Sequence, residues 1–358
     1  MKLMYRIISL AFFCQIIISC QQDHGIKEGI FINEILTNNT CSGYDNDFNN
    51  FSDWIELYNA YPEDKDISGW EIKIGKRKTS SWFLPKNTFL KSKGYIIIWA
   101  DKKDTANHAN FKLNSKSKHI QLINKGLTID SIKIPQKQVI NVSYGRKSDG
   151  ENNWVYFHTP TPKNNNFLKK GVKKIKRSEA PKFSKKGGVY TSELIIEIST
   201  NEGDEIRYTI DGSRPNETSI LYKEPIKVND VKCIRAISMN SVNLASKIVT
   251  NTYFVNPKGN LPFVSISTDF ESLWNSEYGI YENSIKKQNR LANFEYFDGK
   301  KQVINQEIDL SLHGNVAKNH PQKAFKVTAK KKYGESTFKY NFFNNKKANS
   351  FESLLIRA

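Results

Sequence analysis

The side chains able to do chemistry are scattered along this 358-residue sequence, and their spacing matches no metal or nucleophile motif. Zinc sites need histidines or cysteines a few residues apart, as in His-x-x-x-His or Cys-x-x-Cys. Neither pattern occurs, and Gly-x-Ser-x-Gly, Gly-x-Gly-x-x-Gly and P-loop sequences are absent too. Local motifs therefore predict no catalytic residue and no metal ligand among the six histidines, which are His24, His108, His119, His158, His313 and His320.

Two glutamates, Glu34 and Glu56, each follow the start of a predicted strand. A pair of carboxylates can bind calcium, but no dense Asp-x-Asp-x-Asp loop accompanies them. We expect both to accept hydrogen bonds from backbone N–H groups or lysines at strand ends. Cys41 and Cys233 show no disulfide spacing, and we expect two free buried thiols.

The charge balance favours acidic partners. Lys and Arg number 54 against 36 Asp and Glu, a net charge of +18. Nucleic acid, anionic glycans and lipid headgroups all fit that excess. A composition of 38% hydrophobic and 12% aromatic residues excludes an intrinsically disordered chain.

The first 28 residues read as a targeting segment. Lys2 and Arg6 precede an apolar run, residues 7–18, that is too short to span a bilayer comfortably. The following "IISC" resembles a bacterial lipobox, which implies a signal peptide over residues 1–19, lipidation of Cys20, a polar tether over residues 20–28 and a place in the bacterial cell envelope, on the outer membrane or cell surface. The alternative is an ordinary cleaved secretory peptide in which Cys20 has no role.

Short alternating strands between turn residues predict a mainly β protein. Residues 29–36, 53–59 and 70–75 alternate, and the continuous apolar run of residues 94–100 predicts a central strand covered on both faces. This pattern is typical of a β-sandwich.

Seven ordered blocks within residues 29–166, among them "DWIELYN", "LKSKGYIIIWAD", "SYGRKSDG" and "TPTPKNNN", resemble a secreted bacterial lamin tail domain. The resemblance implies an immunoglobulin-like sandwich that binds or scaffolds and has no catalytic residues. Residues 167–180 follow as a predicted basic linker, with an electrostatic patch for phosphate-rich polymer or lipid headgroups as the alternative.

Residues 181–256 form a second predicted β-domain. Asp211 and Gly212 in "DGSRP" favour a tight turn, which explains Asp211 better than catalysis does. The stretch "IRYTIDGSRPNETSILYKEPIKV" resembles the C-terminal β-domain of chitobiase and β-hexosaminidase enzymes, and this implies a second immunoglobulin-like accessory sandwich.

Residues 260–358 resemble the N-terminal part of the spore-coat CotH kinase family, through "LPFVSI", "HGNVAKNHPQKAFKV" and "FESLLIRA". The resemblance implies an incomplete α+β kinase-like lobe, with Lys318 and Lys323 on nucleotide phosphates; surface lysines on a basic hairpin are the favoured alternative. No acidic set for metal binding and nucleophile positioning is found. ATP and Mg²⁺ would be cofactors only if the kinase-like domain were complete. The apolar strand that ends at Ala358 predicts that this domain is interrupted there.

Together these features predict a lipid-anchored binding or scaffolding protein outside the cytoplasm, without a complete active site or a cofactor. Its expected partners are the membrane, through Cys20, and a glycan, a protein or another acidic polymer. Base stacking on nucleic acid is not indicated, because the basic stretch contains few aromatic residues. The alternatives are the first part of a protein kinase and a carbohydrate-binding accessory protein.

Overall fold

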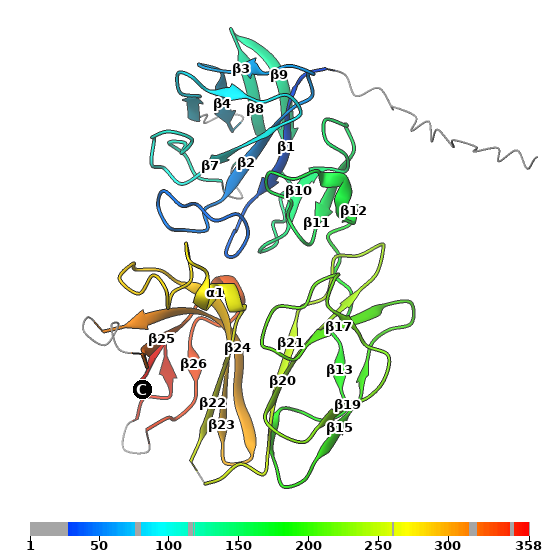
Figure 1. The fold of residues 1–358 in the computed structure, drawn as a ribbon, viewed down its shortest axis with the longest axis vertical. Coiled ribbons are helices and arrows are strands. Elements are labelled where there is room, and N and C mark those ends of the chain that lie inside the picture. The colour runs from blue at the N-terminus through cyan, green and yellow to red at the C-terminus, as the bar shows by residue number, and fades with distance from the viewer. Residues whose placement is uncertain are drawn as a thin grey trace, which may run out of the picture.

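The computed structural model describes residues 28–75, 80–113, 117, 119–259, 261–314, 321–343 and 347–357. These residues are mainly β, as predicted. Figure 1 shows three bodies, which we call unit 1 (residues 28–172, top), unit 2 (residues 181–256, lower right) and unit 3 (residues 261–357, lower left). Within the described ranges, no helix has the length and apolarity needed to cross a membrane.

Unit 1 is a sandwich of two antiparallel sheets. The larger has the order β12-β11-β10-β1-β2-β7, with β1 (Ile30–Leu36), β2 (Trp54–Asn59), β7 (Tyr95–Trp99), β10 (Ser143–Arg146), β11 (Trp154–Phe157) and β12 (Gly171–Val172). The smaller has the order β5-β4-β8-β9, with β4 (Glu71–Ile74), β5 (Ser80–Phe83), β8 (His119–Asn124) and β9 (Leu127–Lys133); β3 (Lys65–Asp66) pairs with β6 (Phe89–Leu90). Alternate strand residues such as Ile55, Leu57 and Leu122 fill the core between the sheets.

The apolar run in β7 predicts a central strand, and this prediction is wrong. β7 is at the end of the larger sheet and pairs with β2 alone among the described strands. A loop covers part of its free edge: Trp99 N donates to Asn107 O at 2.8 Å, and Ala109 N donates to Trp99 O at 2.8 Å. This loop therefore satisfies backbone groups at the free edge, as a neighbouring strand would, and it places His108 against the end of β7.

Residues 167–180, predicted as a basic linker, contact both flanking units. After the short helix η1 (Asn166–Leu168), β12 pairs with β11 through Tyr156 and Val172. Val172 packs with Val142 of unit 1 and Leu244 of unit 2 in one buried cluster. The segment is therefore part of the contact between units 1 and 2.

Units 2 and 3 share a continuous sheet. Its main path is β18-β17-β20-β21-β14-β24-β23-β22, and β25 and β28 extend it from β24. In unit 2 its strands are β14 (Gly188–Tyr190), β17 (Glu205–Thr209), β18 (Ile220–Leu221), β20 (Lys232–Met239) and β21 (Val249–Val255), faced by β13 (Lys182–Phe183), β15 (Leu194–Ile196), β16 (Ile198–Ser199) and β19 (Ile226–Val228). The step into unit 3 is the pair Gly188 and Lys301, where a Cβ on residue 188 would lie 3.0 Å from the Lys300 carbonyl.

Unit 3 has a long hairpin at its centre. Asp298 pairs with Lys301 across an Asp-Gly turn, where Gly299 adopts a φ of 55°. Its elements are β22 (Phe263–Ser267), α1 (Phe270–Trp274), β23 (Arg290–Asp298), β24 (Lys301–His313), β25 (Ala324–Ala329), η3 (Lys331–Tyr333), β26 (Phe338–Lys339), β27 (Ser350–Phe351) and β28 (Ser353–Ile356).

Units 1 and 3 meet around one buried arginine. The Arg290 guanidinium lies 5.4 Å from the Tyr44 ring, 5.3 Å from Phe51 and 5.6 Å from Tyr278. Lys286 Nζ also donates to Asn49 Oδ1 at 2.7 Å. Tyr44, Asn49 and Phe51 belong to the loop of residues 41–51, which we call the docking loop.

Candidate functional site

The three units enclose a cleft of about 740 Å³, which is within the size range of ligand-binding sites. Each unit contributes polar side chains to its wall. They include Cys41, Asn141 and His158 from unit 1, Arg177, Arg214 and Lys247 from unit 2 and the segment before it, and Asp269, Glu307, Lys331, Lys332 and Tyr333 from unit 3.

A tight turn after β17 positions Arg214 in this cleft. Asp211 Oδ1 accepts the Ser213 backbone N–H at 3.0 Å, and Gly212 adopts a φ of 85°, which confirms the turn predicted from "DGSRP". The buried Arg235 stabilises the turn, because its Nη1 donates to Gly212 O at 2.9 Å.

Arg214 links unit 2 to unit 3. Its backbone N–H donates to Asp269 Oδ1 at 2.6 Å, and its Nη1 pairs with Glu307 Oε1 at 3.1 Å. Asp269 is the N-cap residue of α1, but its side chain accepts no capping hydrogen bond from the helix. Both carboxylates in the wall are therefore engaged by Arg214.

The remaining cations give the cleft a positive charge. Arg177 Nη1 donates to the Ala245 carbonyl at 2.6 Å. Within the described part of the chain, Arg177, Lys247 and Lys331 have no carboxylate partner within 4 Å. Lys332 pairs with Asp309 at 3.2 Å. A concave, partly desolvated surface concentrates such a positive potential and attracts anions.

His158 adds an uncharged polar group to the wall. Burial, followed by the nearby charges of Arg177 and Arg214, lowers its pKa to about 4. Its buried Nδ1 has no hydrogen-bond partner among the described residues. At neutral pH this imidazole can therefore bond a ligand without adding charge.

Lys323, one of the two residues predicted for nucleotide binding, does not line this cleft. Lys323 precedes β25, and its Nζ lies 5.4 Å from the Tyr281 ring. Lys318 and the predicted lipidation residue Cys20 lie outside the described residues.

Glu34 and Glu56 are opposite each other in the β1–β2 pair and are fully buried. Glu34 accepts the Thr161 backbone N–H at 3.2 Å, and Glu56 accepts that of Lys163 at 2.6 Å. The expectation that both accept backbone hydrogen bonds is confirmed. Burial raises the pKa of Glu34, and burial together with the charge of Glu34 raises the pKa of Glu56.

Sequence reasoning missed the cleft because its residues are far apart in the chain and share no local motif. The only signal in the sequence was the excess of basic residues, which predicted a negatively charged partner but did not locate a binding site. Cys41 and Cys233 are both free, as expected, but each is half-buried rather than fully buried. Cys41 lies in the cleft wall.

Comparison with protein-family models locates two of the three units. The lamin tail domain model matches residues 26–136, and the Fn3 associated model matches residues 196–253. No curated protein matches the chain. The chain thus combines a region similar to lamin tail domains with a region similar to Fn3-associated domains, two β-sandwich modules of accessory, binding type.

Proposed function

We propose that this protein is a non-catalytic binding protein whose central cleft takes the anionic groups of an acidic polymer, an acidic glycan in the first instance. One observation supports this most strongly. Three cations without carboxylate partners among the described residues and a neutral, half-buried histidine line a ligand-sized cleft between the three units. The basic character of the whole chain would attract such a polymer at long range.

Binding of defined polymers to the full chain tests the proposal. A hexuronate oligosaccharide and polyphosphate supply carboxylate and phosphate groups, and a neutral glucan of similar length is the control. We expect the glycan acid to bind, with an affinity that falls as salt rises, and the neutral glucan not to bind. If the protein bound polyphosphate but not the hexuronate oligosaccharide, the ligand would be a phosphate polymer and not an acidic glycan.

Two substitutions localise the site. Lys331→Gln and Arg177→Gln each remove a charge from the cleft, and we expect each to weaken binding about tenfold. Lys133→Gln removes an exposed lysine from β9, away from the cleft, and should leave affinity unchanged. Equal affinity of all three variants would contradict the cleft as the site.

The anchoring part of the proposal concerns Cys20. A lipidated Cys20 would hold the sandwiches at the bacterial cell envelope, where they would meet envelope polymers. We expect the protein to partition with membranes and Cys20→Ala to release it. Unchanged partitioning of the variant would reject the anchor.

The kinase alternative stays a prediction that rests on the resemblance of residues 260–358. Incubation with radiolabelled ATP tests it: label transferred by the full chain and lost in Lys323→Ala would replace the binding proposal with phosphoryl transfer.

A further inference from the structure

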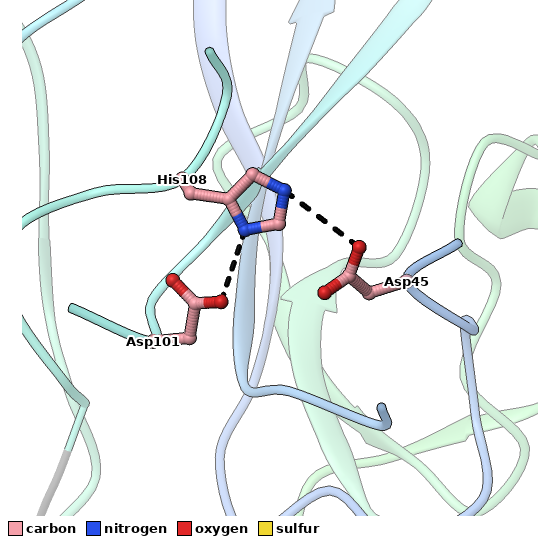
Figure 2. A group of neighbouring side chains, drawn as sticks. All are labelled: Asp45, Asp101 and His108. Atoms are coloured by element: carbon pink, nitrogen blue, oxygen red, sulfur yellow. Dashed lines mark hydrogen bonds and ion pairs between the residues drawn. The ribbon is translucent and has the colours of Figure 1, made fainter. Parts of the chain in front are cut away.

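A second polar cluster lies in unit 1, where the docking loop meets the end of β7. His108 is 1% exposed and lies among three aspartates. Its Nδ1 is 3.0 Å from Asp101 Oδ2, and its Nε2 is 3.2 Å from Asp47 Oδ2 and 3.6 Å from Asp45 Oδ1. Figure 2 shows Asp101 and Asp45 on opposite sides of the imidazole ring.

One buried carboxylate oxygen in this cluster lacks a partner. Asp45 is 1% exposed; its Oδ1 accepts the backbone N–H groups of Asp47 at 2.9 Å and Phe48 at 3.3 Å. Its Oδ2 is buried and accepts no hydrogen bond from the described residues. An unsatisfied buried carboxylate oxygen is costly, and a bound cation would satisfy it.

The net negative charge of the cluster also favours a bound cation. Three aspartates surround a single imidazole, so even a protonated His108 leaves two negative charges unbalanced within the cluster. A divalent cation beside a neutral His108 reduces that excess further.

The distances around the His108 imidazole favour an ion at Nε2 rather than at Nδ1. A tetrahedral ion with bonds of 2.0–2.2 Å to nitrogen and oxygen holds its ligands roughly 3.3 Å apart. The distances from Nε2 to Asp47 Oδ2 and Asp45 Oδ1, 3.2 and 3.6 Å, fit that spacing. The same Asp45 carboxylate carries the Oδ2 that has no partner among the described residues, so it can bind an ion through either oxygen. On the other side, Asp101 is placed to accept the Nδ1 proton, and this arrangement of carboxylate, histidine and metal is typical of zinc proteins.

We propose that His108 Nε2, Asp45 and Asp47 bind a divalent transition metal of the Zn²⁺ class, with Asp101 as the residue that orients His108. An imidazole ligand favours Zn²⁺ over Ca²⁺ and Mg²⁺, which prefer oxygen ligands alone. The Asp47 side chain is 69% exposed, so the ion reaches the site directly from solvent, and water can complete its coordination.

The site links the docking loop to the body of unit 1. Asp45 and Asp47 belong to that loop, whereas Asp101 and His108 follow β7. The same loop presents Tyr44 and Phe51 to Arg290 of unit 3. The metal therefore has a structural role: it fixes the loop on which unit 3 docks.

Titration of Zn²⁺ into the full chain, in competition with a chromophoric chelator, tests the site. We expect Asp47→Asn and His108→Gln each to weaken Zn²⁺ binding at least tenfold, and Asp101→Asn to weaken it by about 10- to 100-fold. His119→Gln, which changes a histidine of β8 outside the cluster, should bind as the parent does. Asp47→Asn is the decisive variant, because its exposed side chain can change without loss of the fold.

The metal site would be ruled out if Asp47→Asn bound Zn²⁺ as tightly as the parent does, or if the parent bound no Zn²⁺. His108 would then be only a buried ion-pair partner of Asp45 and Asp101. Equal affinity for Ca²⁺ or Mg²⁺ would overturn the metal class. Hydrogen exchange tests the structural role: Zn²⁺ should slow exchange of residues 41–51 in the parent and not in Asp47→Asn. Unchanged exchange in a Zn²⁺-bound parent would overturn that role.

Discussion

Unit 1 contains two clusters of buried carboxylates, and they differ in how well their oxygens are satisfied. In the first, Glu34, Glu56 and Asp149 lie under the turn of residues 159–166, and every carboxylate oxygen accepts a hydrogen bond. In the second, around His108, one oxygen of Asp45 accepts none from the described residues.

Burial alone therefore does not distinguish a carboxylate that stabilises the fold from a carboxylate that binds a ligand. The first cluster has donors for all its oxygens, including backbone N–H groups of Thr161, Lys163 and Asn166, so it needs no further ligand. The second cluster has too few donors, which is the condition that an external cation would correct.

The largest effect is expected when the first cluster loses a donor. Asn33 Nδ2 donates to Glu56 at 3.2 Å and to Asp149 at 2.9 Å, so Asn33→Ala leaves two buried carboxylates short of a hydrogen bond. We expect the free energy of unfolding of unit 1 to fall by about 3–5 kcal/mol. Urea unfolding followed by tryptophan fluorescence measures this, because five of the six tryptophans lie in unit 1.

Asn110→Ala is the matched control for that experiment. Asn110 is an exposed residue of the same unit, and its side chain donates only to the Ser81 carbonyl among the described residues. A loss for Asn33→Ala no larger than the loss for Asn110→Ala would mean that the first cluster is not held by its donors.

A smaller effect is expected from pH. Because burial raises the pKa of Glu34 from 4.5 to about 7, the folded state holds a proton that the unfolded state releases. Stability is therefore greatest below pH 4.5 for this group and falls as pH rises through about 7, by about 3 kcal/mol in total. The free energy of unfolding of unit 1, measured from pH 5 to 8, should show this decline.

Glu56→Gln sharpens the pH experiment. Burial, followed by the charge of Glu34, raises the pKa of Glu56 to about 9, so Glu56 also contributes to the decline. The amide of the variant does not titrate, which removes that contribution and leaves Glu34 without a facing carboxylate. We expect a shallower decline and higher stability at pH 8 than in the parent, whereas exposed Glu224→Gln should keep the parent slope. A parent-like slope in Glu56→Gln would show that the two glutamates do not interact.

The smallest effect is expected in the second cluster without metal. Asp47 is largely exposed, so Asp47→Asn in chelator should change the free energy of unfolding by no more than about 0.5 kcal/mol. In Zn²⁺ the parent alone should gain stability, because an ion that binds only the folded state stabilises it. A gain of equal size in the variant would remove the contrast between the clusters.

The local features were predictable from the sequence. Alternation located β1, β2 and β4, and "DGSRP" located the turn that positions Arg214. The position of β7 was not predictable, because an apolar run reports that a strand is covered but not whether a strand or a loop covers it. The cleft was not predictable either, since Arg177, Arg214 and Lys331 meet only through the packing of three units.

By itself the sequence determined the mainly β class, the turns and the positive charge, because strand periodicity, turn chemistry and net charge depend on residues close in the chain or on composition. Only the tertiary structure decided which polar groups meet. His108 and Asp45 are 63 positions apart, and they are neighbours because one loop covers the edge of β7 and another folds back toward it. Such contacts depend on backbone paths that no local pattern specifies.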